Sequence, residues 1–432
     1  MRSNNSNILF QLDWVIILLY LMLVVAGWFS IYATTATVDF LGLLNVETRY
    51  GKQSVWILLS LVIIVFILAL EADFYERYAS VFYVFSIVFL LGLFLFGNTV
   101  KGQTNWYSFG GFSIQPAEFV KVTTALAVAK IMSDHIFDIR KIMDFKNVLL
   151  VLFLPFVIIL LLPDVGSAIV YTSFIFVLLK EKMPSAYFYF SLVFVMIFIA
   201  TVKFGAISIF ILLLLSLALF SYFSYKRNAL FFRKNMIALI VFVFGIIISV
   251  FGSSLAHKHG LKKHHKDRLA LWLRLEKDPV KLKYLKRDYG YNNDQSVKAI
   301  ASGGLLGKGF LQGDRTNGNF VPEQHTDYVF SAVGEEFGFF GSSLVVVLFI
   351  FLILRILYRA EQQRSSFSKI YGYGVASILF FHFAINIGMV TDLLPTVGIP
   401  LPFFSYGGSS LWGFTILIFI FIRLDANRVN EL

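Results

Sequence analysis

The sequence contains no cysteine, which excludes disulfide bonds, thiolate zinc sites and a cysteine nucleophile. Charged residues are also scarce, at 15% of the chain, whereas hydrophobic residues make up 58% and include 49 phenylalanines. A soluble domain could not bury that much apolar surface. The formal net charge of +11 is dispersed along the chain, so it gives no support to nucleic-acid binding. The composition therefore predicts a polytopic membrane protein.

Apolar runs long enough to span a bilayer recur along the chain and predict about twelve transmembrane helices. They cover residues 14–33, 54–71, 79–96, 118–133, 148–163, 165–180, 186–202, 205–224, 235–253, 327–357, 370–391 and 405–423. No cleavable signal peptide is visible, and the first run is expected to stay as the first helix. No internal repeat points to an inverted-repeat transporter. The expected fold class is an all-α polytopic integral membrane protein, with one membrane domain over residues 1–432.

Basic residues in the short loops predict the orientation of the chain. Alternate connections carry most of them, namely Arg140, Lys141, Lys146, Lys180, Lys182, Lys226, Arg227, Arg233, Lys234, Arg359, Arg364 and Lys369. The positive-inside rule places these connections, and with them both termini, in the cytoplasm. The connections 34–53, 97–117, 251–325 and 392–404 then face outward.

One of these outward connections, the large extracytoplasmic loop 251–325, is unusually basic. It carries fourteen Lys/Arg against seven Asp/Glu, and five of the seven histidines of the chain. Positive charge is not expected on that side in short loops. A long basic loop there indicates an anionic ligand at the membrane surface.

The first half of this loop contains an acidic residue beside an apolar segment. Residues 269–273 read LALWL between Arg268 and Arg274, a composition that suits the membrane interface. Because proline stops a helix, Asp278 in the following Asp278-Pro279 pair is expected at the end of an interfacial helix. A carboxylate there can accept a proton from a hydroxyl of a lipid-linked substrate. The alternative is a solvated aspartate paired with a nearby lysine.

The second half is rich in glycine and is followed by two acids. Residues 302–309 read SGGLLGKG, and a lysine among glycine amides suits a phosphate group, although the run is not a Walker loop. The alternative is a tight hairpin or a helix break. Glu335 and Glu336 follow inside an apolar run, where acids are costly unless they face protein or water. They are either site residues or structural hydrogen-bond hubs.

Other polar positions fall at the same side of the membrane. Glu118 and Lys121 lie on one face at the start of a helix, as an ion pair that organises a bundle or lines a cavity. Asp164 marks a helix break, and the segment 394–410, with three prolines and three glycines, cannot be a plain helix. Together these features predict a polar, partly basic cavity that opens to the outer leaflet. They support a lipid-phosphate enzyme or a transporter without choosing between them.

Several segments, in this order, closely resemble the SEDS family (shape, elongation, division and sporulation proteins), and in particular its RodA branch. They read KGQTNWYSFGGFSIQPAEFVK, LPDVGSA, DP followed by GYNNDQSVKAIASGGLLGKGFLQG, FVPEQHTDYVFSAVGEEFGFFG, and GIPLPFFSYGGSS. The last motif is more similar to the elongation branch than to the division branch FtsW.

The resemblance implies a peptidoglycan glycosyltransferase of the bacterial cytoplasmic membrane that polymerises lipid II on the outer face. It places the family's loop carboxylate at Asp278, as general base, and undecaprenyl pyrophosphate as the leaving group. Lys308 and loop arginines would stabilise the pyrophosphate, and Glu118 with Lys121 would shape the cavity. The residues expected to bind the substrate are Lys308, Gln295, Ser296, Glu323, His325 and Arg274. A class B penicillin-binding protein is the implied partner.

Three departures from the family pattern leave alternatives open. Ten helices are usual, so residues 186–253 are expected to hold an extra helix pair. The spacing after Asp278 is long, which makes Asp288 a rival base, and Asn105 stands where an arginine is common. Asp278, Asp288 and Asp294 could hold a divalent cation such as Mg²⁺, although no tight carboxylate motif requires one. The other functions considered are a lipid II flippase and a non-catalytic scaffold.

Overall fold

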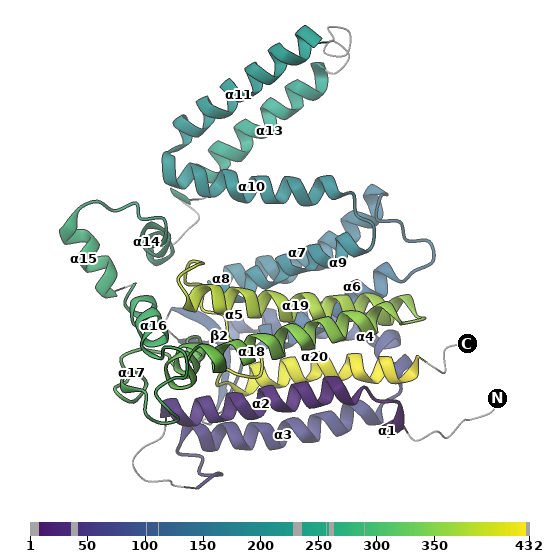
Figure 1. The fold of residues 1–432 in the computed structure, drawn as a ribbon. Helices are drawn as coiled ribbons and strands as arrows, with labels where there is room; N and C mark the ends of the chain where they lie inside the picture. Colours follow the sequence, from purple (N-terminus) through teal and green to yellow (C-terminus); the bar gives the residue numbers. More distant parts are fainter. Residues whose placement is uncertain are drawn as a thin grey trace. The chain divides into compact units, whose positions relative to one another are not determined.

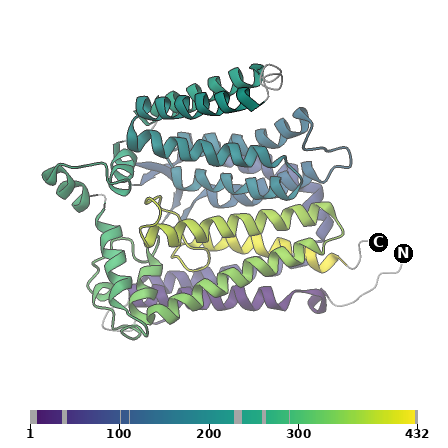
Figure 2. The same cartoon turned by 45° about the horizontal axis from the view of Figure 1, so that its top comes forward.

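The computed structural model describes residues 8–35, 42–100, 102–110, 112–227, 236–255, 257–258, 263–288 and 290–428. Lys101, Arg233 and Lys234 lie outside the described residues. The chain forms two compact units, one made of Met1–Met183 with Asn292–Leu432 and the other of Pro184–Tyr291. Figures 1 and 2 show that helices make up nearly all of each unit, as the sequence predicts.

The first unit is built from two sets of helices that are separated in the sequence by the second unit. The earlier set is α1 (Ile8–Gln11), α2 (Trp14–Thr35), α3 (Arg49–Ala69), α4 (Ala72–Leu91), α5 (Leu93–Phe96), α6 (Pro116–Met132), α7 (Ile142–Leu161), α8 (Val165–Ile169), the 3₁₀ helix η1 (Val170–Phe174) and α9 (Ile175–Lys180). The later set is α16 (Tyr291–Ser302), α17 (Asp314–Asn317), α18 (Val329–Glu361), α19 (Ser366–Val390) and α20 (Gly408–Asn427).

Helix α20 lies at the centre of the first unit. It packs against α3, α6 and α19, and 89% of its spanning window is buried, against 17% for α3. Its neighbour α19 runs beside it in Figure 1, α18 packs against α19, and α2 packs against α18. The last two helices of the chain therefore form the core that positions the segments joining them.

A small antiparallel sheet, which the sequence does not predict, fills the connection between α5 and α6. It consists of β1 (Asn98–Val100), β2 (Gln103–Phe109) and β3 (Phe112–Ile114), in that order. Side chains alternate between the two faces of a strand, and Asn105 and Tyr107 on β2 are buried. The sheet thus directs one face of β2 into the protein.

Nine helices in the described residues are long and apolar enough to cross a membrane: α2, α3, α4 with α5, α7, α10, α11, α18, α19 and α20. The predicted count of about twelve is not confirmed. All three other predicted runs are helical, and two of them are shorter or interrupted. Helix α6 has 17 residues, and residues 165–180 are divided among α8, η1 and α9. The run 235–253 corresponds to α13, Met236–Leu255.

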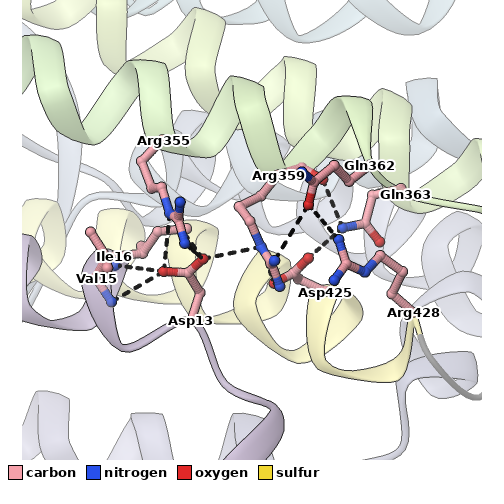
Figure 3. Close-up of polar contacts among 9 residues, drawn as sticks. All are labelled: Asp13, Val15, Ile16, Arg355, Arg359, Gln362, Gln363, Asp425 and Arg428. Carbon is pink, nitrogen blue, oxygen red and sulfur yellow. Dashed lines mark hydrogen bonds and ion pairs between the residues drawn. The ribbon is translucent and has the colours of Figure 1, made fainter.

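An ionic network joins three helices at the end of the first unit where α2 begins and α18 and α20 end (Figure 3). Asp13 accepts backbone hydrogen bonds from the first turn of α2. Its Oδ2 lies 2.8 Å from Nη2 of Arg355 and 3.0 Å from Nε of Arg359. Nη2 of Arg359 also lies 2.5 Å from Oδ2 of Asp425. Because the two carboxylate side chains are 1% and 0% exposed, Arg359 holds two buried charges together.

The described residues of the second unit form five helices: α10 (Ser185–Phe204), α11 (Ala206–Arg227), α13 (Met236–Leu255), α14 (Lys263–Trp272) and α15 (Pro279–Asp288). Gly205, with a φ of 86°, forms the tight turn between α10 and α11. Ile209, Ile246 and Val250 form a small apolar core shared by α11 and α13. The extra helix pair assigned to residues 186–253 falls within this unit and stays a prediction.

Candidate functional site

The connection between α19 and α20, residues 391–407, is non-helical, as its prolines and glycines predict. Side chains from two helices, α19 and α3, bind its backbone. Asn386 on α19 donates from Nδ2 to the carbonyl of Ile399 at 2.7 Å, and Oε1 of Gln53 on α3 accepts from the amide of Gly407 at 3.3 Å. Irregular backbone at membrane depth needs such partners. The α19–α20 connection is therefore a fixed part of the site.

The segment before α18 packs against this connection. The amide of Tyr406 donates to the carbonyl of His325 at 2.8 Å, and Ser405 donates to the carbonyl of Thr326 at 2.6 Å. The ring of His325 stands edge-on to Tyr406, with centroids 5.6 Å apart, and its Nδ1 lies 3.4 Å from Nη1 of Arg49. His325 thus lies where α3 and the α19–α20 connection meet.

Glu118 and Lys121 form the buried pair that the sequence predicts. Nζ of Lys121 donates to Oε2 of Glu118 at 2.6 Å and lies 3.3 Å from Nε2 of His382. Nδ1 of His382 lies 3.2 Å from the carbonyl of Pro400, so the proton of the ring is on Nδ1 and Nε2 accepts from the lysine. The Lys121 ammonium also lies 3.9 Å from the centroid of Phe414. The pair therefore links α6 and α19 to the α19–α20 connection.

Asp164, at the predicted break between α7 and α8, is buried and bound by neutral donors. Its Oδ2 accepts from Nδ2 of Asn105 at 2.7 Å, from the hydroxyl of Ser167 at 2.7 Å and from Nε2 of Gln115 at 3.4 Å. Its Oδ1 accepts from the amide of Ser167 at 2.9 Å. Within the described residues it forms no ion pair. Asn105, which stands where the SEDS proteins that the sequence resembles commonly have an arginine, thus binds Asp164 through a neutral amide.

The glycine-rich loop, residues 303–309, packs against a kink in α18. The kink is at Gly338, where φ is 62° and ψ is −157°. The amide of Lys308 donates to the carbonyl of Glu335 at 3.0 Å, and the amide of Phe339 donates to the carbonyl of Gly304 at 2.9 Å. A side chain at Gly338 would collide with this loop. The glycines therefore allow two backbones to approach closely, and phosphate binding by the loop stays a prediction.

Glu335 is a hydrogen-bond hub, which is one of the two roles left open by the sequence. Its Oε1 accepts from Nζ of Lys308 at 2.7 Å and from the amide of Arg315 at 3.0 Å. Its Oε2 accepts from the amide and the hydroxyl of Thr316 at 2.9 and 2.8 Å. Lys308 also lies 3.0 Å from Oδ2 of Asp314. The hydrogen bond that Lys308 donates to Glu335, above all, raises the pKa of Lys308, which is therefore cationic at neutral pH.

Glu336 differs from its neighbour. It is also buried, but its Oε1 accepts no hydrogen bond within the described residues. A buried carboxyl oxygen without a partner is costly. For Glu336 the choice between a site residue and a structural one therefore stays open.

Gln295 and Ser296, both on α16, face different partners. Oε1 of Gln295 accepts from Nη1 of Arg315 at 2.5 Å, so Gln295 is joined to the Glu335 hub. Ser296 is buried and donates to the carbonyl of Val390 at 2.9 Å. Ser296 therefore fixes α16 to the end of α19, and because the residue is fully buried, any contact with substrate would need α16 to move.

Asn293, which the sequence analysis does not single out, joins α16 to the α19–α20 connection. Its Oδ1 accepts from the hydroxyl of Tyr328 at 2.9 Å and from that of Thr396 at 3.2 Å. Its Nδ2 donates to Oδ1 of Asp392 at 2.8 Å. No local pattern predicts these contacts, because the partners lie 35 to 103 positions away.

Glu323 lies in a turn just before α18. Its φ is 58°, and its Oε2 accepts from the hydroxyl of Thr326 at 3.2 Å. The neighbouring Gln324 is buried and donates to the carbonyls of Thr34 at 3.2 Å and Thr316 at 2.9 Å. Gln324 therefore anchors this turn to the end of α2 and to α17.

Asp278 belongs to the second unit, and its predicted position at the end of an interfacial helix is wrong. Helix α14 ends at Trp272, and Asp278 instead precedes α15, whose first residue is Pro279. Proline is also favoured at the first position of a helix. Oδ1 of Asp278 accepts from the amide of Val280 at 3.0 Å. The side chain is exposed, and in the described part of the chain its Oδ2 accepts no hydrogen bond.

The two other sequence candidates of this unit lie at helix ends. Arg274 is exposed and follows α14 with a φ of 55°, and Asp288 is the exposed last residue of α15. Lys281 pairs with Glu276, whose Oε2 lies 2.5 Å from the lysine Nζ. The lysine thereby lowers the pKa of Glu276. The expected lysine pairing near Asp278 therefore falls on Glu276.

The structure gathers most of the predicted residues of the first unit at one end of it. Lys308 and Gln295 meet around the Glu335 hub, whereas His325 and the Glu118–Lys121 pair contact the α19–α20 connection. No group of three His, Asp or Glu side chains that could hold a metal occurs within the described ranges. This end of the first unit gathers polar and charged side chains, and the binding of an anionic ligand there stays a prediction.

These features define a class: a multi-pass α-helical membrane protein with a polar site built from the connections at one end of its helices. The family model of the FtsW, RodA and SpoVE cell cycle proteins matches residues 13–430, and the chain belongs to this family. The predicted membership of the SEDS proteins is thereby confirmed.

Curated relatives and solved structures agree with this family. The peptidoglycan glycosyltransferase RodA of Treponema pallidum is 28% identical over 404 residues, which cover 89% of this chain and 91% of the relative. The peptidoglycan glycosyltransferase MrdB of Escherichia coli K12 is 29% identical and covers 84% and 81%. A chain of a peptidoglycan synthase complex has a TM-score of 0.68 at 21% identity and covers 97% and 99%. RodA of Thermus thermophilus has a TM-score of 0.60 at 21% identity and covers 96% and 97%. The solved structures show the shared fold.

Proposed function

We propose that this protein is a peptidoglycan glycosyltransferase that polymerises lipid II into glycan strands for cell elongation and shape. Relatives that match more than four fifths of the chain are named for this enzyme class, and they belong to the RodA-like branch that the motifs predict. The observation that carries the proposal is the polar layer around the α19–α20 connection, which consists of the Glu335 hub, His325 and the Glu118–Lys121 pair. This polar layer adjoins the apolar helices of the membrane domain, so a charged head group and its lipid chain could bind side by side.

In the proposed reaction Asp278 is the general base. Its exposed Oδ2 takes the proton of the acceptor hydroxyl, and the hydroxyl oxygen forms a bond to the anomeric carbon of the donor. The bond from that carbon to the pyrophosphate breaks at the same time, and undecaprenyl pyrophosphate leaves with the electron pair. A single displacement inverts the anomeric centre. Asp288 is the rival base.

Cationic groups are proposed to stabilise the departing pyrophosphate. The side chain of Lys308 is 25% exposed, although Glu335 and Asp314 already bind its ammonium group. Arg274 and His325 are the other proposed contacts, with Gln295, Ser296 and Glu323 bordering the substrate. The Glu118–Lys121 pair acts on substrate only through the α19–α20 connection, which it holds in place.

The protein is multi-pass in the membrane, and we place it in the bacterial cytoplasmic membrane with both termini inside. The absence of native cysteine makes this testable with single cysteines at Leu306 and Ile136, which are 80% and 79% exposed. An impermeant maleimide added to intact spheroplasts is expected to label Leu306→Cys and to spare Ile136→Cys. The reverse pattern would invert the topology and exclude outward polymerisation.

We propose a class B penicillin-binding protein as the partner that cross-links the peptides. The single Ser-x-x-Lys pattern of the chain, Ser366 to Lys369, lies in a connection that the positive-inside rule places in the cytoplasm, on the wrong side for that reaction. One solved structure of the same fold belongs to a complex that coordinates polymerisation and cross-linking. We also propose that a divalent cation such as Mg²⁺ arrives with the pyrophosphate and leaves with it.

The test is polymerisation of labelled lipid II in proteoliposomes that contain the chain with and without its cognate penicillin-binding protein. The expected result is a ladder of glycan strands that needs this chain and persists when the transpeptidase is inhibited. A second assay follows the movement of fluorescent lipid II across the same vesicle membrane. Movement without polymer would favour a flippase, and neither activity in a competent complex would leave a scaffold.

A further inference from the structure

An apolar groove of ≈ 390 Å³ lies between α2 and α18. Ala26 and Phe29 line it from α2, and Val333, Phe337 and Leu344 line it from α18. These positions belong to the second half of α2 and the first half of α18, so the groove lies toward the end of the unit that carries the candidate site. Its volume falls within the range of ligand pockets.

Two other phenylalanines connect the groove with the candidate site. Phe310 directly follows the glycine-rich loop, and its ring packs 5.9 Å from Phe29 and 6.2 Å from Phe337. Phe404 belongs to the α19–α20 connection and is 1% exposed, whereas Leu344 on α18 is 59% exposed. One side of the groove therefore faces the membrane, and the other is formed by the segments that build the polar layer.

Positive charge stands at the same end of the groove. Lys308 precedes Phe310 by two residues, and Arg49 adjoins Tyr50, whose ring lies 5.1 Å from Tyr32. Tyr32 in turn stacks on Phe310 at 6.2 Å. Cations beside an apolar groove suit a lipid whose chain enters the groove and whose anionic head stays outside. The carboxylates of the Glu335 hub oppose this charge in part.

We propose that the groove binds the isoprenoid chain of the lipid-linked substrate, at the isoprene units next to its pyrophosphate. This inference rests on the proposed function. An isoprenoid has a methyl branch in every unit, and it fills a pocket walled by four phenylalanine rings by van der Waals contact. An ordinary phospholipid is the competing occupant. The groove would then select the substrate lipid from the bilayer and present its pyrophosphate to the polar layer.

The activity test fills the groove and varies the length of the substrate chain. Ala26→Phe and Leu344→Trp narrow the groove from its two sides, and Val25→Phe adds the same ring at the neighbouring, 51% exposed position of α2 that does not line it. For lipid II with the full chain, both groove variants are expected to raise KM at least about fivefold. For a short-chain lipid II analogue that carries a methyl group in place of the isoprenoid, nothing enters the groove and KM is expected to stay unchanged, as it should with both substrates in Val25→Phe.

If Ala26→Phe and Leu344→Trp fold but leave the KM for lipid II with the full chain unchanged, the proposal is overturned. Equal increases for both substrates would also overturn it, because the chain would then not be the part that is recognised. The short-chain rate itself shows that each variant is folded and active.

A cross-linking test reads the groove without polymerisation. Lipid II with a photoreactive group in its first isoprene units is expected to label α2 and α18 peptides of the wild type and to spare them in Ala26→Phe. Labelling by photoreactive phosphatidylglycerol alone would assign the groove to ordinary lipid and overturn the proposal. If lipid II labels the groove but no polymer forms in the assay above, the proposed function fails while the groove assignment stands.

Discussion

Replacing Asp278 by asparagine separates the two roles that the structure gives to this side chain. Its Oδ1 accepts the amide of Val280 and caps α15, and asparagine caps a helix about as well as aspartate. Asp278→Asn should therefore fold normally but lose the general base, which typically contributes about 10²–10⁴-fold to a rate. Asp278→Ala loses the cap as well, at a cost of about 1 kcal/mol. We expect kcat to fall at least about 100-fold in both variants, with the thermal midpoint lowered only in Asp278→Ala.

Asp288→Asn is the matched control. The ten residues of α15 separate the two aspartates by roughly 15 Å, so one cannot replace the other at a single reacting hydroxyl. The assay is the initial rate of lipid II polymerisation in proteoliposomes, with thermal unfolding of each variant measured in detergent. An active Asp278→Asn beside an inactive Asp278→Ala would refute the base assignment and leave only the cap. Loss in Asp288→Asn alone would move the base to Asp288.

Three further predictions concern two buried charged residues, Arg359 and Glu335, and the proposed divalent cation. Arg359→Met leaves the buried Asp425 without its ion pair and Asp13 with Arg355 alone. The change should cost about 3–5 kcal/mol, measured as a lower thermal midpoint, and a midpoint equal to wild type would contradict the network. Glu335→Gln loses the charge that binds Lys308 and should lower the local stability of the loop by about 1–3 kcal/mol. The expected readout is faster hydrogen exchange in residues 303–317, and unchanged exchange would exclude the role of Glu335 as a hub. EDTA should stop polymerisation reversibly without lowering the thermal midpoint, since the divalent cation is proposed to arrive with the pyrophosphate; a lowered midpoint would indicate a resident ion.

Patterns within a single segment predict much of this fold. The apolar runs give the helices, the proline at 163 and Asp164 give the break before α8, and the spacing of Glu118 and Lys121 gives the pair on one face of α6. The prolines and glycines of 394–410 likewise predict the irregular connection. Each of these features depends on residues a few positions apart, so the local rules suffice.

The features that the sequence does not predict depend on distant segments or on signals with two meanings. Asn293 meets Thr396, and Gln295 meets Arg315, across connections that no local pattern specifies. Pro279 illustrates the second case, because proline both ends helices and begins them. The sequence predicts that Asp278 lies at the end of a helix, whereas in the structure it lies at the beginning of one. That change turns Asp278 from a trailing residue into a cap.

Gly338→Ala tests whether the kink in α18 exists for the glycine-rich loop. The φ of 62° and ψ of −157° at this position are accessible to glycine but cost other residues about 1–3 kcal/mol. An alanine Cβ would also stand 2.8 Å from the carbonyl of Leu305. The helix on either side of the kink keeps its own hydrogen bonds, so the loop is the part that gives way. We expect faster hydrogen exchange in residues 303–309 and a loss of polymerisation.

The matched control for this change is Gly245→Ala on α13, where an added Cβ meets nothing within 4 Å. Alanine is a better helix former than glycine by about 0.8–1.0 kcal/mol, so this variant should be as stable as wild type or more so. If Gly338→Ala also keeps wild-type exchange and activity, α18 can straighten without releasing the loop. The close approach of the two backbones would then be a consequence of packing and not a requirement of the site.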